Sequence, residues 1–309
     1  MIKEFEFKDH EEWLDIRSKY IGGSDAGAVI GLNPYKSRYS LWAEKTGKVP
    51  GFEGNISTKV GSYLEELVAK LFEEETGKKV RRKNRTMVND KYPFACANID
   101  RAIVGEKALL EIKTTTSIPI MKQLRGKEFP EAYYAQVVHY MAVTELEKAY
   151  LAVLVNCREL KVYELNRDEA EIDALMQAEE EFWECVKNDT APALDGMDAT
   201  SESILAMYPE STDKDVDLMA YESNLRDYVH TSNLIKDLTK MKEEQANIIK
   251  EFMRDAGSGS YGIYKVSYKS SERKTFDAVK FAKENKNIPL DDYYKVSSTR
   301  TFRVTVKED

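Results

Sequence analysis

Cysteine is scarce in this chain of 309 residues. Its three cysteines, Cys96, Cys157 and Cys185, lie far apart, and none belongs to a Cys-x-x-Cys pair. A disulfide framework and a four-cysteine zinc or iron–sulfur site are therefore excluded. The simplest interpretation is that the three cysteines are small apolar residues of the core.

Long hydrophobic runs are also missing. No stretch approaches the roughly 18 uncharged apolar residues that a membrane-spanning helix requires, and residues 1–10 are charged, without the apolar segment of a secretion signal. We therefore expect a cytoplasmic protein with no membrane role. Because 42% of the residues are apolar, the chain can bury the core of one large or two modest domains.

The chain lacks the positive net charge that is typical of nucleic-acid-binding proteins, since its formal net charge is −8. The acidic excess is local. Residues 159–217 hold 18 acidic and 4 basic residues, a net charge of −14, which leaves +6 for the rest of the chain. A separate basic run at residues 78–85 suits a phosphate backbone, although a solvated edge strand has a similar composition.

Helix and strand patterns alternate over residues 11–195, which favours an α/β or α+β core over a helical bundle or a β-sandwich, and we assign the core to the α/β class. We assign residues 1–195 to one core domain and expect a mixed central sheet flanked by helices. The main helices are predicted at residues 37–45, 60–76, 131–144 and 168–186, and the strands at 92–104, 107–115, 149–156 and 161–165.

The remaining residues are predicted to form a linker and an accessory region. Residues 196–217 belong to a segment rich in Ala, Ser, Thr, Asp and Pro, and we expect a linker or an extended segment there. Residues 218–309 follow as an accessory region, with a long helix over 218–254 and strands over 261–269 and 297–307 around a short helix near 277–284. The long helix has an apolar stripe that needs a partner surface, and the region holds no cluster of acids with a lysine.

The strands on either side of Gly105-Glu106 carry the first candidate site. If these two residues are the loop of a hairpin, residues whose numbers sum to 211 face each other, which pairs Asp100 with Glu111. Lys113 lies on the same face as Glu111, because side chains alternate along a strand. Two carboxylates and a lysine suit a magnesium ion that polarises a phosphodiester, with the lysine orienting water or neutralising charge. The alternative is a solvated hairpin, but Glu111 lies in an apolar strand where an unpaired acid is costly.

Two helices bring further polar side chains toward this hairpin. Glu65 flanks the apolar stripe of the helix that follows Val60 and can reach the sheet, whereas Glu66 is predicted to point to solvent. On the helix over 131–144, Gln136 and Tyr140 share one face. Tyr140 is either a simple core residue or a support of the site.

Near the amino terminus, Gly22-Gly23-Ser24 precedes a helix of small residues. Free backbone N–H groups at such a helix start can capture a phosphate, and Arg17, seven residues before Ser24, can add a second contact. Ser24 and Asp25 are also ordinary helix-capping residues, so this motif is weak by itself.

Together these residues resemble the YqaJ-like viral recombinases, phage-type recombination nucleases related to lambda exonuclease within the PD-(D/E)xK superfamily. The resemblance extends from about Trp13 to Thr144. One departure is Ile99, which stands where the family has proline before Asp100. The motifs that carry the resemblance, in family order, are Arg17, Gly22-Gly23-Ser24, Gly31 to Tyr35, Lys45-Thr46-Gly47, Gly61 with Leu64-Glu65, Asp100, Glu111-Ile112-Lys113 and Gln136 to Tyr140.

The resemblance implies a restriction-endonuclease-like core and a role for each matching residue. Asp100, Glu111 and the Ile112 carbonyl would be metal ligands, with Glu65 as a more distant one. Lys113 would act on the attacking water and Gln136 would support the site. Arg17 and Ser24 would hold a terminal 5′-phosphate.

The implied activity is a Mg²⁺-dependent exonuclease, with Mn²⁺ as an alternative ion. It would digest one strand of linear double-stranded DNA from 5′ ends and leave 3′ single strands for a single-strand annealing protein, in a bacterial or phage-infected cell. Family members commonly form homo-oligomeric rings. The rivals are a structure-specific or restriction-like endonuclease on the same core, and a catalytically idle DNA-binding or scaffold module, which the retained acids and Lys113 argue against. A related exonuclease family with an iron–sulfur cluster is disfavoured by the missing cysteines.

Overall fold

The computed structural model describes residues 1–52, 54–125, 129–295 and 299–306. The chain forms two compact units, Met1–Tyr208 and Pro209–Asp309. None of the helices in the described part is both long and apolar enough to cross a membrane.

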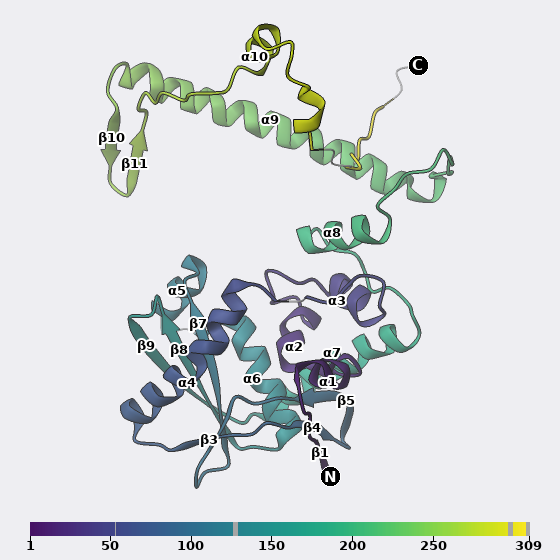
Figure 1. Ribbon diagram of the computed structural model, residues 1–309, viewed down its shortest axis with the longest axis vertical. Helices are drawn as coiled ribbons and strands as arrows, with labels where there is room; N and C mark the ends of the chain where they lie inside the picture. Colours follow the sequence, from purple (N-terminus) through teal and green to yellow (C-terminus); the bar gives the residue numbers. More distant parts are fainter. Residues whose placement is uncertain (53, 126–128, 296–298, 307–309) are drawn as a thin grey trace. The chain divides into compact units, whose positions relative to one another are not determined.

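A five-stranded mixed sheet is the centre of the first unit (Figure 1). Its strand order is β3-β6-β7-β8-β9, in which β7 and β8 are parallel and the other pairs are antiparallel. This sheet lies between helices, as the α/β assignment predicts. Its strands are β3 (Val80–Arg82), β6 (Arg101–Ile103), β7 (Ala108–Thr115), β8 (Lys148–Val155) and β9 (Glu159–Asn166).

A second, four-stranded sheet adjoins the first and supports the amino-terminal helices. Its strand order is β1-β4-β5-β2. The strands are β1 (Ile2–Phe5), β2 (Ile21–Gly22), β4 (Thr86–Asn89) and β5 (Tyr92–Ala97), and the helices nearby are α1 (His10–Ser18), α2 (Gly23–Val29) and α3 (Arg38–Lys45).

The helices on the five-stranded sheet form where apolar residues recur at helical spacing. Helix α4 (Ile56–Thr76) begins at the capping residue Asn55 and ends at Gly77, whose φ of 71° favours glycine. It buries Val68 and Phe72 against Leu110 and Ile112 on one face of β7. The other face is covered by α5 (Ile118–Arg125) and α6 (Glu131–Thr144), and α7 (Glu169–Lys187) packs on α6.

The single strand predicted over residues 92–104 is wrong. The chain forms β5, then a turn over residues 98–100, then β6, and these two strands belong to different sheets. The Asn98 side chain donates to the Arg85 carbonyl at 3.3 Å and to Thr86 Oγ1 at 2.9 Å. These bonds tie the turn to the start of β4, so the chain passes from one sheet to the other immediately before Asp100.

The segment predicted as a linker contains a helix, α8 (Asp198–Met207), that packs on α3. The Thr200 hydroxyl donates to Ser37 Oγ at 2.7 Å, and the Tyr39 hydroxyl lies 3.8 Å from Met207 Sδ. The first compact unit therefore extends to Tyr208, beyond the boundary at residue 195. Cys96 is buried as interpreted, but Cys157 is exposed.

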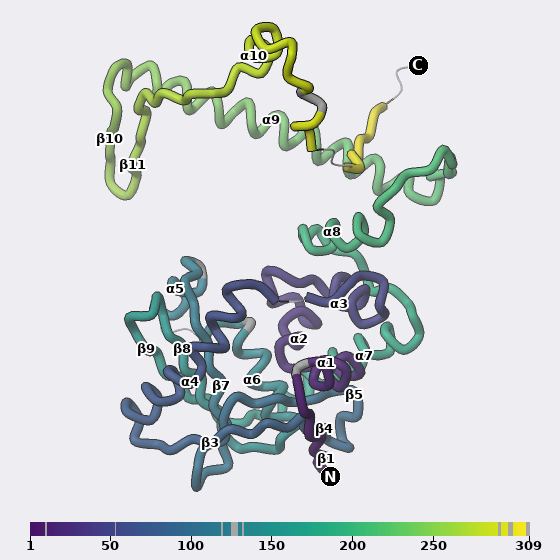
Figure 2. Tube along the Cα trace, viewed as in Figure 1, coloured from purple at the N-terminus to yellow at the C-terminus, as the bar shows by residue number. Residues whose placement is uncertain are grey.

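The second unit consists mainly of one long helix, α9 (Glu222–Met253), preceded by a short helical turn (Met219–Tyr221). A hairpin of β10 (Ser258–Tyr261) and β11 (Tyr264–Ser267) replaces the single strand expected over 261–269. Figure 2 shows the chain turning back along α9 after this hairpin, through α10 (Ala278–Glu284), the short helix that was expected. Phe302 packs on Tyr228 with ring centroids 5.4 Å apart.

One expectation for this unit is wrong. Residues 299–306 are not a strand, and residues 297, 298 and 307 of the strand predicted over 297–307 lie outside the described residues. The apolar stripe of α9 is largely uncovered among the described residues, with Ile235 and Leu238 about 60% exposed, so the partner surface that it needs stays a prediction.

A fully buried pair, His139 on α6 and Glu179 on α7, fastens the helical layer of the first unit. His139 Nδ1 lies 2.8 Å from Glu179 Oε1, and Nε2 lies 2.9 Å from the Cys96 carbonyl oxygen on β5. Burial alone would lower the pKa of His139, but the Glu179 carboxylate outweighs burial and raises it. Because both ring nitrogens face acceptors, the folded pair retains a proton that an unfolded histidine loses above its usual pKa of 6.5.

This retained proton predicts a pH-dependent stability. The stabilisation is complete below about pH 6.5 and is lost as the pH rises through the raised pKa, with a slope of up to about 1.4 kcal/mol per pH unit for one proton. Tryptophan fluorescence can follow the unfolding of the first unit alone, because Trp13, Trp42 and Trp183 all lie in it. His139→Gln should flatten the dependence of the unfolding free energy on pH between about pH 6.5 and 9. The control His230→Gln, at an exposed position of α9, should not. An unchanged slope in His139→Gln would contradict this assignment.

Candidate active site

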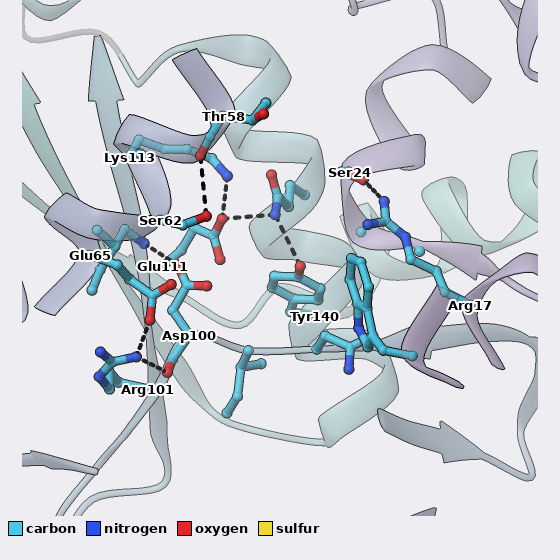
Figure 3. Close-up of a pocket in the computed structure, with 18 of the residues that line it drawn as sticks. Arg17, Ser24, Thr58, Ser62, Glu65, Asp100, Arg101, Glu111, Lys113 and Tyr140 are labelled. Carbon is cyan, nitrogen blue, oxygen red and sulfur yellow. Dashed lines mark hydrogen bonds and ion pairs between the residues drawn. The ribbon is translucent and has the colours of Figure 1, made fainter. Parts of the chain in front are cut away.

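A cleft of about 740 Å³ in the first unit brings the predicted site residues together (Figure 3). Its walls come from α1, α2, α4, α6, the turn before β6, and β7. The cleft is lined by every residue predicted for the site: Arg17, Ser24, Glu65, Asp100, Glu111, Ile112, Lys113, Gln136 and Tyr140.

The hairpin has the register that the sequence predicts. Arg101 pairs with Leu110 and Ala102 with Leu109, so the numbers of each pair sum to 211 as predicted. The loop is longer than the two residues expected, covering residues 104–107, but it has the same centre and therefore the same register. Asp100 lies immediately before β6, and its Oδ2 accepts a hydrogen bond from the Ile112 N–H at 2.7 Å.

Glu111 is the most deeply buried acid of the cleft, with 1% of its surface exposed. Its Oε1 accepts hydrogen bonds from Lys113 Nζ and from Gln136 Nε2, the latter at 2.8 Å. Its Oε2 is buried and has no hydrogen-bond partner among the residues that the structure describes. A carboxylate oxygen in this state is costly unless a cation reaches it.

Burial and the neighbouring charges shift the pKa values of Asp100, Glu111 and Lys113. Burial, and then the neighbouring Glu111 charge, raise the pKa of Asp100 well above its usual value. Burial also raises the pKa of Glu111, although Lys113 opposes the shift. For Lys113, burial lowers the pKa, but Glu111 and Asp100 outweigh it and raise the pKa overall. Without a bound cation, Lys113 is therefore a protonated hydrogen-bond donor to Glu111.

Glu65 lines the cleft but is held by Arg101. The side chain of Arg101, which is 3% exposed, is bonded to Glu65 and lies 3.1 Å from Glu66 Oε2. Because Arg101 pairs with Leu110, it faces α4, on the opposite side of the strand from Asp100. Glu66 is half exposed as expected but is also ion-paired, with Arg101 and with Arg82.

The acid pair fits a divalent cation in its donor chemistry. Asp100, Glu111 and the Ile112 carbonyl offer hard oxygen ligands, and Glu111 Oε2 is left without a donor. Within the described parts of the chain, no three Asp, Glu, His or Cys side chains gather closely enough to hold a metal by themselves. Glu65 does not join the acid pair as a third ligand here, because its carboxylate is bonded to Arg101.

Arg17 and Ser24 form the other end of the cleft. Arg17 Nη2 is bonded to Ser24 Oγ, and its guanidinium carbon lies 5.1 Å from the centre of the Trp13 ring. The Gly22 N–H is not free as expected, because it donates to Asp25 Oδ2 at 3.1 Å.

Lys45 fixes the position of the Asp25 carboxylate. Its Nζ lies 3.0 Å from Asp25 Oδ2 and donates to the Tyr20 carbonyl at 2.7 Å. Burial would raise the pKa of Asp25, but Lys45 and Arg17 lower it strongly. Asp25 is therefore a permanent anion that anchors the start of α2 and faces Arg17.

Tyr140 connects the two ends of the cleft. Its hydroxyl accepts a hydrogen bond from Gln136 Nε2 at 3.0 Å, beside Glu111. Its ring packs against Gly23, where an added Cβ would lie 2.4 Å from the tyrosine Cε1. Tyr140 is thus buried like a core residue and is also bonded to the residue that contacts the acid pair.

Sequence reasoning missed several residues of the cleft. Arg101 was detectable from strand alternation, which directs the residue after Asp100 toward α4. Trp13 was detectable because it lies one helical turn before Arg17. Asn98 also lines the cleft, and so do Lys83 and Asn84 of the basic run, whose place beside the acids only the fold reveals.

Comparison with known proteins places the chain in a family. A model of the YqaJ-like viral recombinase domain matches residues 12–147. The protein YqaJ of Bacillus subtilis is 40% identical over 299 residues, covering 95% of this chain and 92% of that protein. The chain belongs to the YqaJ-like viral recombinase family. A shorter similarity of 40% over 62 residues, 18% of this chain and 17% of the other, connects this YqaJ-family chain with protein D345L of African swine fever virus.

Solved structures show the same fold. The alkaline exonuclease LHK-Exo of Laribacter hongkongensis is 19% identical, with a TM-score of 0.51 over 59% of this chain and 94% of that one. The structure of LHK-Exo in complex with dAMP has a TM-score of 0.52 with the same coverage and identity. The YqaJ-family core therefore has the restriction-endonuclease-like fold, as predicted.

The charge balance of the site predicts the effect of Asp100→Asn on stability. Asparagine can still accept from the Ile112 N–H but removes the repulsion with Glu111, so the metal-free variant should be more stable at neutral pH. A gain of about 1 kcal/mol would raise Tm by about 2–4 °C. Thermal unfolding in EDTA, followed by tryptophan fluorescence, measures this change.

Titration with Mg²⁺ or Mn²⁺ should then raise the Tm of the wild type but not that of Asp100→Asn. The matched control is Asp173→Asn, which replaces an exposed acid of α7. It should change neither the Tm in EDTA nor the rise in Tm that the metal ion causes. Equal Mg²⁺-induced shifts in the wild type and Asp100→Asn would contradict the placement of a cation at Asp100.

Proposed function

We propose that this YqaJ-family chain is a Mg²⁺-dependent exonuclease that degrades one strand of linear double-stranded DNA in the 5′-to-3′ direction. The 3′ single strands that remain would be substrates for a single-strand annealing protein in phage-type recombination. One observation carries the proposal: a single cleft holds the buried pair Asp100 and Glu111 with Lys113, and also the cationic Arg17 beside Ser24. The family and the fold shared with an alkaline exonuclease support it.

Asp100, Glu111 and the Ile112 carbonyl are the residues that would hold Mg²⁺, with Glu65 as a more distant ligand. A bound Mg²⁺ would polarise the scissile phosphodiester and lower the pKa of the attacking water, and Mn²⁺ could replace it. Binding of the ion would also satisfy the Oε2 atom of Glu111, which lacks a donor.

Lys113 and Gln136 position and balance this site. Lys113 is protonated and bonded to Glu111, so it can orient the attacking water and neutralise charge that develops on the phosphate. Gln136 donates to Glu111 Oε1 at 2.8 Å, which leaves the other carboxylate oxygen available as a ligand for an ion. Tyr140 holds Gln136 in turn.

Arg17 and Ser24 would bind the terminal 5′-phosphate. A guanidinium offers two charge-assisted donors to phosphate oxygens, and the Ser24 hydroxyl adds a third. Asp25 lies 4.0 Å from Arg17 Nη2 and keeps the guanidinium in place. This end of the cleft is the basis for the proposed polarity.

The proposal also includes a homo-oligomer that encircles the DNA and an annealing protein as the partner. Both are inferred from the family. The rival activity is an endonuclease on the same core. Digestion of end-labelled linear duplex with Mg²⁺, beside covalently closed plasmid, separates the two. An exonuclease degrades the linear DNA from its 5′ ends and spares the plasmid, and cleavage of the plasmid would overturn the exonuclease assignment.

We predict that Asp100→Ala, Glu111→Ala and Lys113→Ala each abolish digestion of linear duplex while the fold and duplex binding persist. Losing a metal ligand or the adjacent cation removes several kcal/mol of transition-state stabilisation, so the rate should fall at least about 1,000-fold. Steady-state digestion assays with Mg²⁺ measure this, with duplex binding in EDTA as the control. Turnover above a few per cent of wild type in Glu111→Ala would contradict the site assignment.

A 5′-phosphate on the duplex end should speed digestion, and Arg17→Ala or Ser24→Ala should remove most of that advantage. Charge-assisted hydrogen bonds contribute roughly 1.5–3 kcal/mol each, so digestion of phosphorylated ends should slow about 10- to 100-fold. Substrate with a 5′-hydroxyl should be slow in wild type and nearly unchanged in the variants. Equal slowing of both substrates would show that Arg17 and Ser24 are only structural.

A further inference from the structure

A second hollow, of about 530 Å³, adjoins the cleft and is lined almost entirely by the basic run. We call it the β3–β4 hollow. Arg81, Arg82, Lys83, Asn84 and Arg85 line it, and Glu4 is the one acid that the lining includes. Lys83 and Asn84 also line the cleft, so the hollow and the cleft share part of one wall.

Strand register connects the hollow to the acid pair. On β3, Arg82 pairs with Arg101 on β6. The next residues along these antiparallel strands are Lys83 and Asp100, so the basic loop leaves the sheet at the point where Asp100 enters it. A polyanion bound in the β3–β4 hollow would therefore continue into the cleft.

Glu4 of β1 and Glu6, which follows this strand, neutralise part of the hollow. Glu4 lies 2.6 Å from Lys83 Nζ and 2.9 Å from Arg85 Nη1, and Glu6 lies 2.6 Å from Arg85 Nη2. The pairing of Phe5 with Thr86 places these carboxylates beside the loop. Lys83 and then Arg85 lower the pKa of Glu4. All four side chains are at least 30% exposed, so phosphate oxygens can replace these surface ion pairs at little cost.

We propose that the β3–β4 hollow binds the phosphate backbone of duplex DNA beyond the cleavage site, and that Glu4 and Glu6 hold Lys83 and Arg85 until phosphate displaces them. This inference rests on the proposed function. The hollow presents four cations within five residues and a single amide, which suits charge neutralisation of a backbone and not the reading of bases. The two residues that the hollow shares with the cleft, Lys83 and Asn84, favour this role over that of a merely solvated run.

The first test removes two cations that line the hollow but not the cleft, in the double variant Arg81→Gln/Arg85→Gln. Its matched control is Lys70→Gln/Lys122→Gln, which removes two exposed lysines of α4 and α5 that line neither. Fluorescence anisotropy with a labelled 20-base-pair duplex in EDTA measures binding without cleavage. The hollow variant should bind about tenfold more weakly, and the slope of log K against log salt should shrink by about one per lost phosphate contact.

The second test removes the competing acids in Glu4→Gln/Glu6→Gln, which should bind the duplex several-fold more tightly. Its control is Glu159→Gln/Glu164→Gln on β9, where each acid is likewise paired with a lysine. The control removes the same formal charge and should change affinity less than twofold. Tryptophan fluorescence confirms that each variant is folded.

Digestion by the wild type in Mg²⁺, measured in parallel, separates failure of this inference from failure of the proposed function. If the wild type digests linear duplex but each hollow variant binds like its control, the DNA-binding role of the β3–β4 hollow is contradicted and the proposed function stands. If the duplex affinities of the hollow variants change as expected but neither Mg²⁺ nor Mn²⁺ supports digestion, the proposed function is contradicted and the DNA-binding role of the hollow stands. A wild type that binds no duplex overturns both.

Discussion

The burial of the Glu111 carboxylate in the central strand is the constraint on which the rest of the site depends. A charge in such surroundings is tolerated only with compensation, which Lys113 and Gln136 supply to one oxygen. Asp100 brings a second acid beside it and raises the electrostatic cost. Burial raises the pKa of both acids, and the described residues compensate the pair only in part. The hard oxygen donors of the pair therefore fit a divalent cation.

The break between the two sheets is what places Asp100 at that position. A continuous strand over residues 92–104 would carry Asp100 along one sheet, with both neighbours in the ladder. Instead, Asn98 binds the start of β4, and the chain changes sheets immediately before the acid. Asp100 therefore stands at the mouth of the hairpin, where its Oδ2 can bond to the Ile112 N–H and its carboxyl still borders the cleft.

Features of local origin were predictable from the sequence, and features of tertiary origin were not. Helix α4 and the register of Asp100 with Glu111 follow from apolar spacing and from a loop centred on Gly105. The turn at Asn98 was hidden because residues 92–104 keep an alternating pattern on both sides of it. The docking of α8 depends on Thr200 reaching Ser37, 163 residues away, and no local pattern encodes such a contact. The hydrogen bond from the Gly22 N–H to Asp25 was missed for a different reason. The same sequence pattern suits a capping side chain and a bound phosphate, because both accept from the N–H groups at a helix start.

Helix α6 gives the cleft its fixed length. Gln136 and Tyr140 lie one turn apart on it, so one contacts Glu111 while the other contacts Gly23 at the start of α2. The spacing is rigid, because a Cβ at residue 23 would clash with the tyrosine ring and the phenol is bonded back to Gln136. In the proposed function, the end of the DNA is held at Arg17 while the bond to be cut lies at Asp100 and Glu111. The distance between these points would then determine which phosphodiester is attacked, so the packing of Tyr140 on Gly23 would set the size of the product.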